Sequence, residues 1–466
     1  MHWILSATAC RGRSYRSWSG QLKAVSQLST ATKQAVQTLP EQHLLYGNAG
    51  SKIAASIQKQ QGSYRAVISV HPEAHSNDNI TIVWGFYRSS TGKWYIPEGV
   101  KSSGACQKDS RSGGMKSEVK ATNGAYQLSF DIPAQLAPLS LAFELQTADS
   151  VELSRAGQRF AVPIGMSAGR TTRLGASLRG SPTEKCAVDF VVRSRGATAM
   201  SLLLARAPRE GAAGSQGRPS GCLEIALDPT VNRTGDLWHI CVEGLKDLGT
   251  LCYAWRADAE VAWEGGGRFY PGQVMFDPYA PAVASVQLQE GYNVVPAREG
   301  QNGAAYKNNP PAVMGCLASL LENFDFGSSQ RPDTPLEQSM LLEIDVASFT
   351  RNEDAQDEVP LAHQGKFMGL LDRLKMIKQT GATGCILTPV HASAPGSGQL
   401  GRAPIAFFAP DNSFAVGQEP GAAALELKQV VRGFHEAGIE VILQARSLLI
   451  VIELSAHLEG TNNTAE

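Results

Sequence analysis

The feature that most constrains the fold of this chain is a change in hydrophobic periodicity about two thirds of the way along it. Before residue 302, apolar residues mostly alternate with polar ones, as in β-strands with one buried face. After residue 336, short apolar runs alternate with segments whose apolar residues recur every three or four positions, as in strands connected by amphipathic helices. The 466 residues therefore predict several structurally different parts.

The first β region, residues 64–165, is predicted to form a small antiparallel β-sandwich. Its strands are marked by three alternating sets: Ile80, Ile82, Trp84 and Phe86; Tyr126, Leu128, Phe130 and Ile132; and Leu139, Leu141, Phe143 and Leu145.

Trp84 and Trp94 in this region have two interpretations. Flat aromatic rings stack on the apolar faces of sugars, which makes both residues candidates for glucan binding. Alternating aromatic residues in a sandwich are more often core residues, which is the alternative. The stretch IVWGFYRSSTGKWYIP resembles the starch-binding modules of plastid glucan-phosphorylating dikinases.

A second β region, residues 170–285, carries the more specific motif LEIALDPTVNRTGDLWHICVEGL. With Tyr253, Arg256 and the exit Asp277-Pro278-Tyr279-Ala280, this motif resembles the N-terminal carbohydrate-binding-type sandwich of isoamylases. These are the starch-debranching branch of the α-amylase superfamily, glycoside hydrolase family 13. The resemblance implies that most tryptophans here are structural. Trp263, beside three glycines, is the candidate for an exposed glucan-binding ring.

Residues 336–466 read as strand, helix, strand, helix, strand, with residues 286–335 as an irregular linker. The order of Glu343, Phe349-Thr350, Pro389-Val390-His391 and Phe407-Phe408 follows the isoamylase pattern, and the resemblance extends from Leu174 to Leu443. It implies the first three βα units of a (β/α)8 TIM barrel. The predicted fold class is therefore multidomain: two immunoglobulin-like β-sandwiches of the carbohydrate-binding-module type, followed by a partial TIM barrel.

The resemblance also implies that the chemistry of the family is missing. Retaining glycosidases need two carboxyl groups about 5–5.5 Å apart. From Pro335 onward the chain has 132 residues, whereas a complete barrel needs about 250. Where isoamylases have Trp-Gly-Tyr, this chain has Leu400-Gly401-Arg402. Where the third strand of the family ends in Asp-Val-Val-x-Asn-His, this chain has Gln444 to Leu449. We expect no catalytic residues, and we expect degenerate active-site positions at Arg402, Gln444, Leu448 and Leu449.

Three functions remain open. The first is a non-catalytic, glucan-binding or regulatory subunit of a debranching complex, which binds α-glucan such as starch or amylopectin and pairs with a catalytic isoamylase. The second is a truncated or mis-spliced product of an active α-1,6-glucosidase that hydrolyses branch points. The third is a free-standing starch-binding protein.

Composition excludes several other classes. A net charge of −1 argues against a nucleic-acid partner, and no apolar run approaches the roughly 18–20 residues that span a bilayer. The eight cysteines show no metal-binding spacing, so neither a zinc site nor a disulfide framework is expected, and no cofactor is predicted.

The first 45 residues are basic, rich in serine and threonine, and without an acidic residue before Glu41. This composition is typical of an organelle transit peptide, and with the isoamylase resemblance it predicts the chloroplast stroma. A disordered basic tail is the alternative. Composition alone does not separate plastid from mitochondrial targeting.

Overall fold

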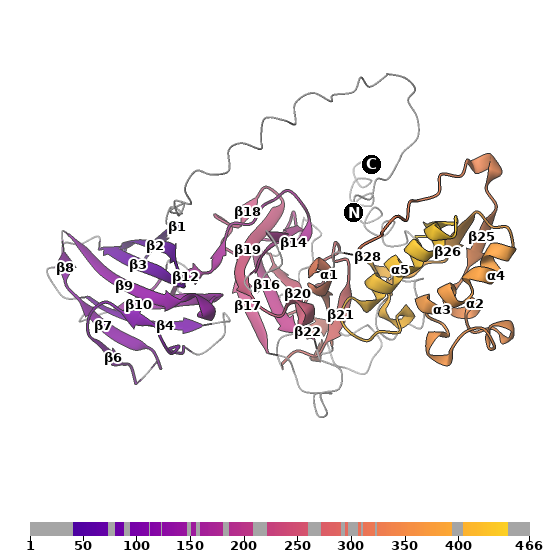
Figure 1. Ribbon diagram of the computed structural model, residues 1–466. Helices are drawn as coiled ribbons and strands as arrows, with labels where there is room; N and C mark the ends of the chain where they lie inside the picture. The colour runs from indigo at the N-terminus through magenta and orange to yellow at the C-terminus, as the bar shows by residue number, and fades with distance from the viewer. Residues whose placement is uncertain are drawn as a thin grey trace, which may run out of the picture. The chain divides into compact units, whose positions relative to one another are not determined.

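The computed structural model (Figure 1) describes most of the chain between Glu41 and Ala445. The described residues are 41–72, 80–87, 94–110, 112–122, 124–146, 151–154, 159–179, 186–207, 221–259, 272–289, 294–296, 306–308, 311–321, 324–393 and 404–445. The predicted transit peptide lies outside them as far as residue 40, and the first strand begins at Glu41.

Two antiparallel sheets form the first part of the chain, and their buried side chains belong to one hydrophobic core. The cores of both sheets come from residues that alternate along each strand, because successive side chains of a strand point to opposite faces. One sheet has the order β1 (Glu41–Tyr46), β2 (Lys52–Gln60), β3 (Ser63–His71), β9 (Ala125–Pro133) and β5 (Lys101–Ser102), with β8 (Ala121–Thr122) on β9. The other has the order β11 (Val151–Glu152), β10 (Leu139–Gln146), β4 (Ile80–Tyr87), β7 (Met115–Val119) and β6 (Cys106–Lys108), with β12 (Phe160–Ile164) on β10.

Two further antiparallel sheets follow and share a second core. One has the order β13 (Met166–Ser167), β19 (Leu237–Leu245), β15 (Cys186–Arg193) and β14 (Gly175–Arg179), with β18 (Arg233–Thr234) on β19. The other has the order β17 (Cys222–Ala226), β16 (Ala199–Arg206), β20 (Leu251–Asp258), β24 (Ala312–Cys316) and β21 (Val283–Val286). Strand β24 comes from inside the predicted linker, residues 286–335, and is an interior strand of this sheet.

The C-terminal part contains the one parallel sheet of the described residues, with the order β25 (Leu341–Ile344), β26 (Gly384–Leu387) and β29 (Glu440–Leu443). Buried residues of these strands and of the neighbouring helices form one core, which includes Phe367, Val430 and Phe434. The helices are α2 (Val346–Phe349), α3 (Phe367–Asp372), α4 (Leu374–Gln379) and α5 (Ala422–Glu436); α1 (Ala318–Leu321) precedes them. Two-stranded ribbons pair β22 (Val294–Pro296) with β23 (Tyr306–Asn308), and β27 (His391–Ser393) with β28 (Pro404–Pro410).

The predicted fold class is wrong. Instead of two immunoglobulin-like sandwiches and a partial TIM barrel, the described residues form seven small sheets that are mostly antiparallel. They contain five α-helices, and only α5 is longer than six residues. One local departure from the predicted pattern is visible at Arg373. The helix predicted from the periodicity after Gly365 breaks there into α3 and α4, because the buried guanidinium turns inward to bond the carbonyl oxygen of Phe349 (2.7 Å).

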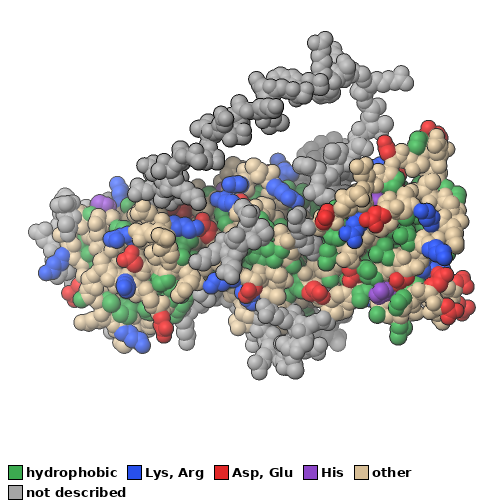
Figure 2. Space-filling view, in the orientation of Figure 1, with side chains coloured by type: hydrophobic (Ala, Val, Ile, Leu, Met, Phe, Trp, Pro, Cys, Tyr) green, Lys and Arg blue, Asp and Glu red, His purple; other side chains and the backbone are tan. Residues whose placement is uncertain are grey.

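Acidic and basic side chains are interspersed on the visible face of the molecule, in agreement with the near-zero net charge (Figure 2). Among the described helices, none has the length and apolarity that a membrane crossing requires. Within the same described segments, no three His, Cys, Asp or Glu side chains converge as a metal site would require.

Candidate functional site

Trp84, the first predicted glucan-binding residue, lies in the core of the first part of the chain. Its side chain is 2% exposed, and its indole N–H donates to the hydroxyl of Ser117 (2.9 Å). The ring meets Phe130 edge to face, with 4.9 Å between ring centroids. A ring that is enclosed on both faces and satisfied in its hydrogen bond has no surface for a sugar, so the core interpretation describes Trp84.

Trp94 lies elsewhere, on the face of β4 and β10 that points away from that core. It is 6% exposed, packs against Val83 and Ala142, and approaches two glycines closely. A Cβ atom on Gly85 would come within 3.0 Å of the Trp94 side chain, and a Cβ on Gly114 would overlap the ring. We call Trp94, Gly85 and Gly114 the tryptophan cradle.

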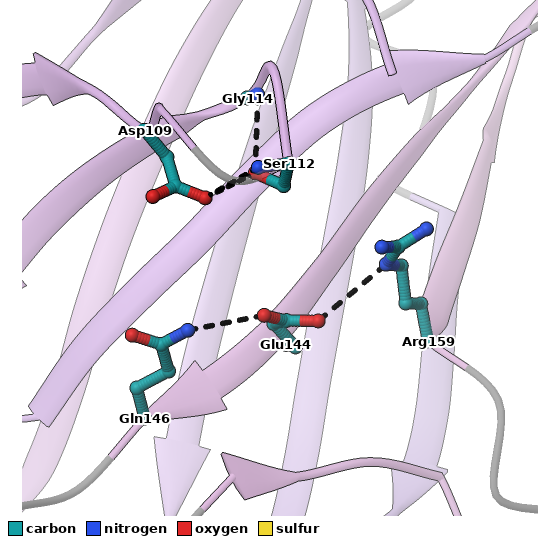
Figure 3. A network of polar contacts seen from close by, with 6 residues as sticks. All are labelled: Asp109, Ser112, Gly114, Glu144, Gln146 and Arg159. Atoms are coloured by element: carbon teal, nitrogen blue, oxygen red, sulfur yellow. Dashed lines mark hydrogen bonds and ion pairs between the residues drawn. The ribbon is translucent and has the colours of Figure 1, made fainter. Parts of the chain in front are cut away.

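An exposed arginine covers the Trp94 ring. The guanidinium carbon of Arg159 lies 4.3 Å from the ring centroid, in the position of a cation–π contact. Glu144 accepts from Arg159 Nε (3.4 Å) and from the amide nitrogen of Gln146 (3.1 Å), so one carboxylate joins both side chains (Figure 3). The indole N–H of Trp94 is buried without a hydrogen-bond partner among the described residues.

A polar turn holds Gly114 in place (Figure 3). The buried carboxylate of Asp109 accepts hydrogen bonds from the backbone N–H and the hydroxyl of Ser112. The same hydroxyl accepts from the N–H of Gly114 (3.2 Å), and Lys116 pairs with Asp109 at 3.3 Å. Because these bonds set the backbone of the turn, the cradle is preformed rather than assembled by a ligand.

The electrostatics of this face follow from Arg159. Burial raises the pKa of the Tyr87 phenol, and the nearby Arg159 charge opposes part of that rise. Tyr87 therefore stays protonated at neutral pH and remains a hydrogen-bond donor next to the cradle. The face combines one aromatic ring, one cation, one carboxylate and neutral donors, which is a set suited to binding hydroxyl groups.

A second candidate is an open cleft of about 470 Å³ at the carboxyl ends of β25 and β26. It is lined by Glu343, Ile344, Asp345, Ser348, Phe349, Asn352 and Thr388. The carboxyl ends of parallel strands are where α/β proteins place binding residues, so polar side chains are expected here.

Asp345 in this cleft has a structural task. One carboxylate oxygen caps α2 by accepting from the backbone N–H (3.0 Å) and the hydroxyl (2.9 Å) of Ser348. The other accepts from the Thr388 hydroxyl at 3.2 Å and so joins the ends of β25 and β26. Of the two carboxylates that line the cleft, only the exposed Glu343 is not bound in this network.

The predicted degenerate positions are only partly described. Gln444 follows β29, exposes its side chain, and donates its backbone N–H to Leu387 (2.9 Å). Arg402, Leu448 and Leu449 lie outside the described residues, as does Trp263, the third predicted glucan-binding tryptophan. His391 is buried behind this edge; burial lowers the pKa of its imidazole, which favours the neutral form.

Sequence reasoning missed Arg159, Glu144 and Gln146. Charged and amide residues at strand ends are ordinary solvent-facing choices, so their types gave no signal. The available signal was Gly85 in the middle of an apolar strand, because a glycine there often marks the close approach of another group.

Comparison with known proteins gives a consistent set of relatives. No family model matches the chain. It is 30% identical over 297 residues to isoamylase 3, chloroplastic, of Oryza sativa subsp. japonica, covering 60% of this chain and 35% of the relative. It is 25% identical over 406 residues to isoamylase 2, chloroplastic, of Arabidopsis thaliana, covering 85% and 41%. It is 31% identical to the glycogen operon protein GlgX homolog of Haemophilus influenzae, covering 50% and 33%.

Among solved structures, the chain is similar to the Group B Streptococcus pullulanase SAP in complex with maltotetraose, with 14% identity and a TM-score of 0.42. That likeness covers 83% of this chain and 44% of the other. The first of the curated relatives, isoamylase 3, is matched over 35% of its length, so this chain corresponds to a little over a third of it.

Proposed function

Because this chain belongs to the isoamylase-type family of starch- and glycogen-debranching proteins, we propose that it is a non-catalytic, glucan-binding subunit that works beside a catalytic isoamylase. Its ligand is an α-glucan such as amylopectin. The observation that carries the proposal is the Trp94 ring, which is 6% exposed, packs closely against Gly85 and Gly114, and has the exposed guanidinium of Arg159 4.3 Å from its centroid.

Binding begins with displacement of Arg159. A glucose ring that stacks on Trp94 takes the place of the Arg159 guanidinium, which lies 4.3 Å from the ring centroid. An exposed cation–π contact contributes only about 0.5–1 kcal/mol, so a sugar that stacks on the ring displaces it readily. Glu144, which loses its bond to Arg159, and its neighbour Gln146 then serve as acceptor and donor for sugar hydroxyls.

The cleft beside β25 and β26 supports the non-catalytic part of the proposal. Hydrolysis with retention uses two carboxyl groups that act as nucleophile and acid/base. Here Asp345 is engaged by Ser348 and Thr388, and Gln444 at the neighbouring strand end carries no charge. Among the described residues that line the cleft, Glu343 is the one carboxylate outside this network, and it can bind a hydroxyl group.

The proposed partner surface is the open face of the parallel sheet. The register places Glu343, Ile386 and Ile442 in one row across β25, β26 and β29. Ile442 and Leu341 on this face are 39% and 42% exposed. Exposed apolar side chains gathered on a sheet mark interaction surfaces, which supports contact with a catalytic isoamylase.

We place the protein in the plastid, because isoamylases 2 and 3 among its relatives carry chloroplastic names and residues 1–45 have transit-peptide composition. A fluorescent protein fused behind residues 1–45 is expected to enter chloroplasts. Import into mitochondria, or retention in the cytosol, would contradict this placement.

Glucan binding is tested by affinity electrophoresis of four variants in amylopectin gels. Trp94→Ala should weaken retardation about tenfold, which corresponds to about 1.4 kcal/mol. Arg159→Ala should strengthen it, because the ring loses its competitor. Arg233→Ala removes a cation from the ring of Trp238 in the second core, and Trp84→Phe alters the first core, so neither should change it. Equal retardation of all four folded variants would rule out the cradle as the site.

The non-catalytic assignment is tested separately. The purified chain should release no reducing ends from amylopectin or β-limit dextrin, alone or after Glu343→Gln. Debranching that survives repeated purification and disappears with Glu343→Gln would show that the cleft is catalytic and would favour the enzyme interpretation.

A further inference from the structure

Two cysteines that lie far apart in sequence face each other inside one sheet. Cys252 of β20 and Cys316 of β24 are directly opposite in the antiparallel register, with 3.8 Å between their sulfur atoms. Both side chains are buried, and both are free thiols. They lie on the face of the sheet that carries Leu203, Ala254 and Met314.

The backbone shows which kind of antiparallel pair this is. Leu317 N–H donates to Leu251 C=O (3.0 Å), whereas Cys316 N–H turns to the other side and donates to Ala282 C=O (2.8 Å). Cys252 and Cys316 therefore form a non-hydrogen-bonded pair, whose Cα atoms are about 4.5 Å apart. A disulfide bridges Cα atoms that are about 4.4–6.8 Å apart, so this pair can be joined without moving the strands.

The two cysteines lie in the shortest ladder of this sheet. Strand β24 is paired with β20 at only two positions, Cys252↔Cys316 and Tyr253↔Gly315. On either side the ladders are longer: β16 and β20 are paired at eight positions, and β21 and β24 at four. Separation along this short ladder, which we call the β20–β24 seam, would release β21 and β24 as a unit. It would expose both thiols together.

We propose that Cys252 and Cys316 are a redox-active pair that forms a reversible disulfide across the β20–β24 seam. The oxidant is a low-molecular-weight disulfide. When the seam opens, the Cys252 thiolate attacks one sulfur of that disulfide and expels one thiolate. The Cys316 thiolate then attacks the sulfur of Cys252 and expels the second. Two protein thiols lose two electrons and two protons, and the small disulfide becomes two thiols.

Closure of the seam protects the pair. The hydrogen bond with Cys252, together with burial, raises the pKa of Cys316 well above its ordinary value, so little thiolate exists in the closed sheet. Reaction is therefore limited by opening of the seam. The disulfide, once made, prevents that opening and holds the chain that continues from β24 against the sheet.

Three other described cysteines lie in other sheets: Cys186 in β15, Cys241 in β19 and Cys385 in β26. Cys222 lies in the same row, but Ala205 stands between it and Cys252, which separates them by two strand spacings, about 9.6 Å. Cys106 is exposed on β6 of another sheet and serves as an internal measure of thiol reactivity.

The test is oxidation of the full chain by glutathione disulfide, with denaturation in alkylating reagent and peptide mass spectrometry. We expect a peptide pair joined through Cys252 and Cys316, with a glutathione adduct on Cys106. Cys316→Ala should abolish the joined pair, and Cys222→Ala should leave it unchanged. If Cys106 takes up glutathione while Cys252 and Cys316 remain thiols, or if Cys252 joins Cys222, the proposal is overturned.

A second measurement separates a stabilising bond from an incidental one. Thermolysin should cleave the oxidised chain within β24 about tenfold more slowly than the reduced chain, because the disulfide removes the open state. Cys252→Ala should be cleaved at the same rate under both conditions. Equal rates for oxidised and reduced wild-type protein would show that the bond does not control the seam.

Discussion

Substitution of Gly114 by alanine is the sharpest physical test of the tryptophan cradle. At an unstrained glycine with open space around it, this change stabilises a protein by about 0.4–1 kcal/mol, because it restricts the unfolded chain. At Gly114 the new Cβ would overlap the Trp94 ring and lie 2.6 Å from the carbonyl oxygen of Trp84. Overpacking of this kind costs about 1–3 kcal/mol, so the clash outweighs the entropic gain. We expect a net loss of about 1–2 kcal/mol.

The assay is urea-dependent hydrogen exchange of the β4 and β7 amides in four proteins: wild type, Gly114→Ala, Trp94→Ala and the double mutant. Removal of the ring relieves one of the two clashes and leaves the one with Trp84, so the Gly114→Ala penalty should shrink by about 1 kcal/mol. Gly249→Ala, where nothing lies within 4 Å of the added Cβ, is the control and should not destabilise. Additive effects in the double mutant would refute the idea that Gly114 exists to accommodate the ring.

Three further predictions follow from buried polar groups. Arg373→Met should lower the free energy of unfolding by about 1–3 kcal/mol in urea titrations, because Phe349 C=O and Asn352 Oδ1 lose their donor; an unchanged midpoint would contradict this. Tyr253→Phe should cost a similar ~1–3 kcal/mol, since it removes the hydroxyl that donates to buried Asp277 (3.1 Å), with Tyr95→Phe as the control. Burial and then the charge of Glu243 raise the pKa of Glu41 to about 7. The folded state thus binds a proton that the unfolded state releases near pH 4.5, and stability falls as pH rises from 4.5 to 7. Glu41→Gln should therefore be more stable than wild type at pH 8 and equal to it at pH 4; a pH-independent difference in melting temperature would exclude this linkage.

Local patterns in the sequence located many strands but not their assembly. The alternating sets at Ile80–Phe86, Tyr126–Ile132 and Leu139–Leu145 coincide with β4, β9 and β10, because one face of each strand is buried and the period of two records it. The sequence pattern does not indicate the break between α3 and α4 at Arg373, because Leu370, Leu374 and Ile377 keep the helical period across it. What ends α3 is a tertiary contact of the arginine, which a single-sequence pattern does not contain.

The candidate site also depends on tertiary contacts that the sequence pattern does not contain. The sequence could present Trp84 and Trp94 only as two similar aromatic residues, each either core or platform. Their difference depends on Gly114, twenty residues after Trp94, and on Arg159, which directly precedes β12 and is placed by the pairing of β12 with β10. Strand β24 was not predicted for a related reason. It is five residues long and lies in a segment with several prolines, so the sequence pattern alone is that of a linker.

The parallel sheet can be completed only late in synthesis, because its central strand pairs with a strand that follows much later in the chain. Its central strand β26 is complete long before β29, since the paired residues Gly384 and Glu440 are 56 positions apart. At roughly 5–20 residues per second, the ribosome needs about 3–11 s to cover that interval. During this time one edge of β26 has β25 as a neighbour and the other has none, so Cys385 and Leu387 belong to a nascent surface that invites intermolecular pairing. A chaperone that binds extended apolar segments during translation would meet its substrate here, at a strand whose two edges are both paired in the finished protein.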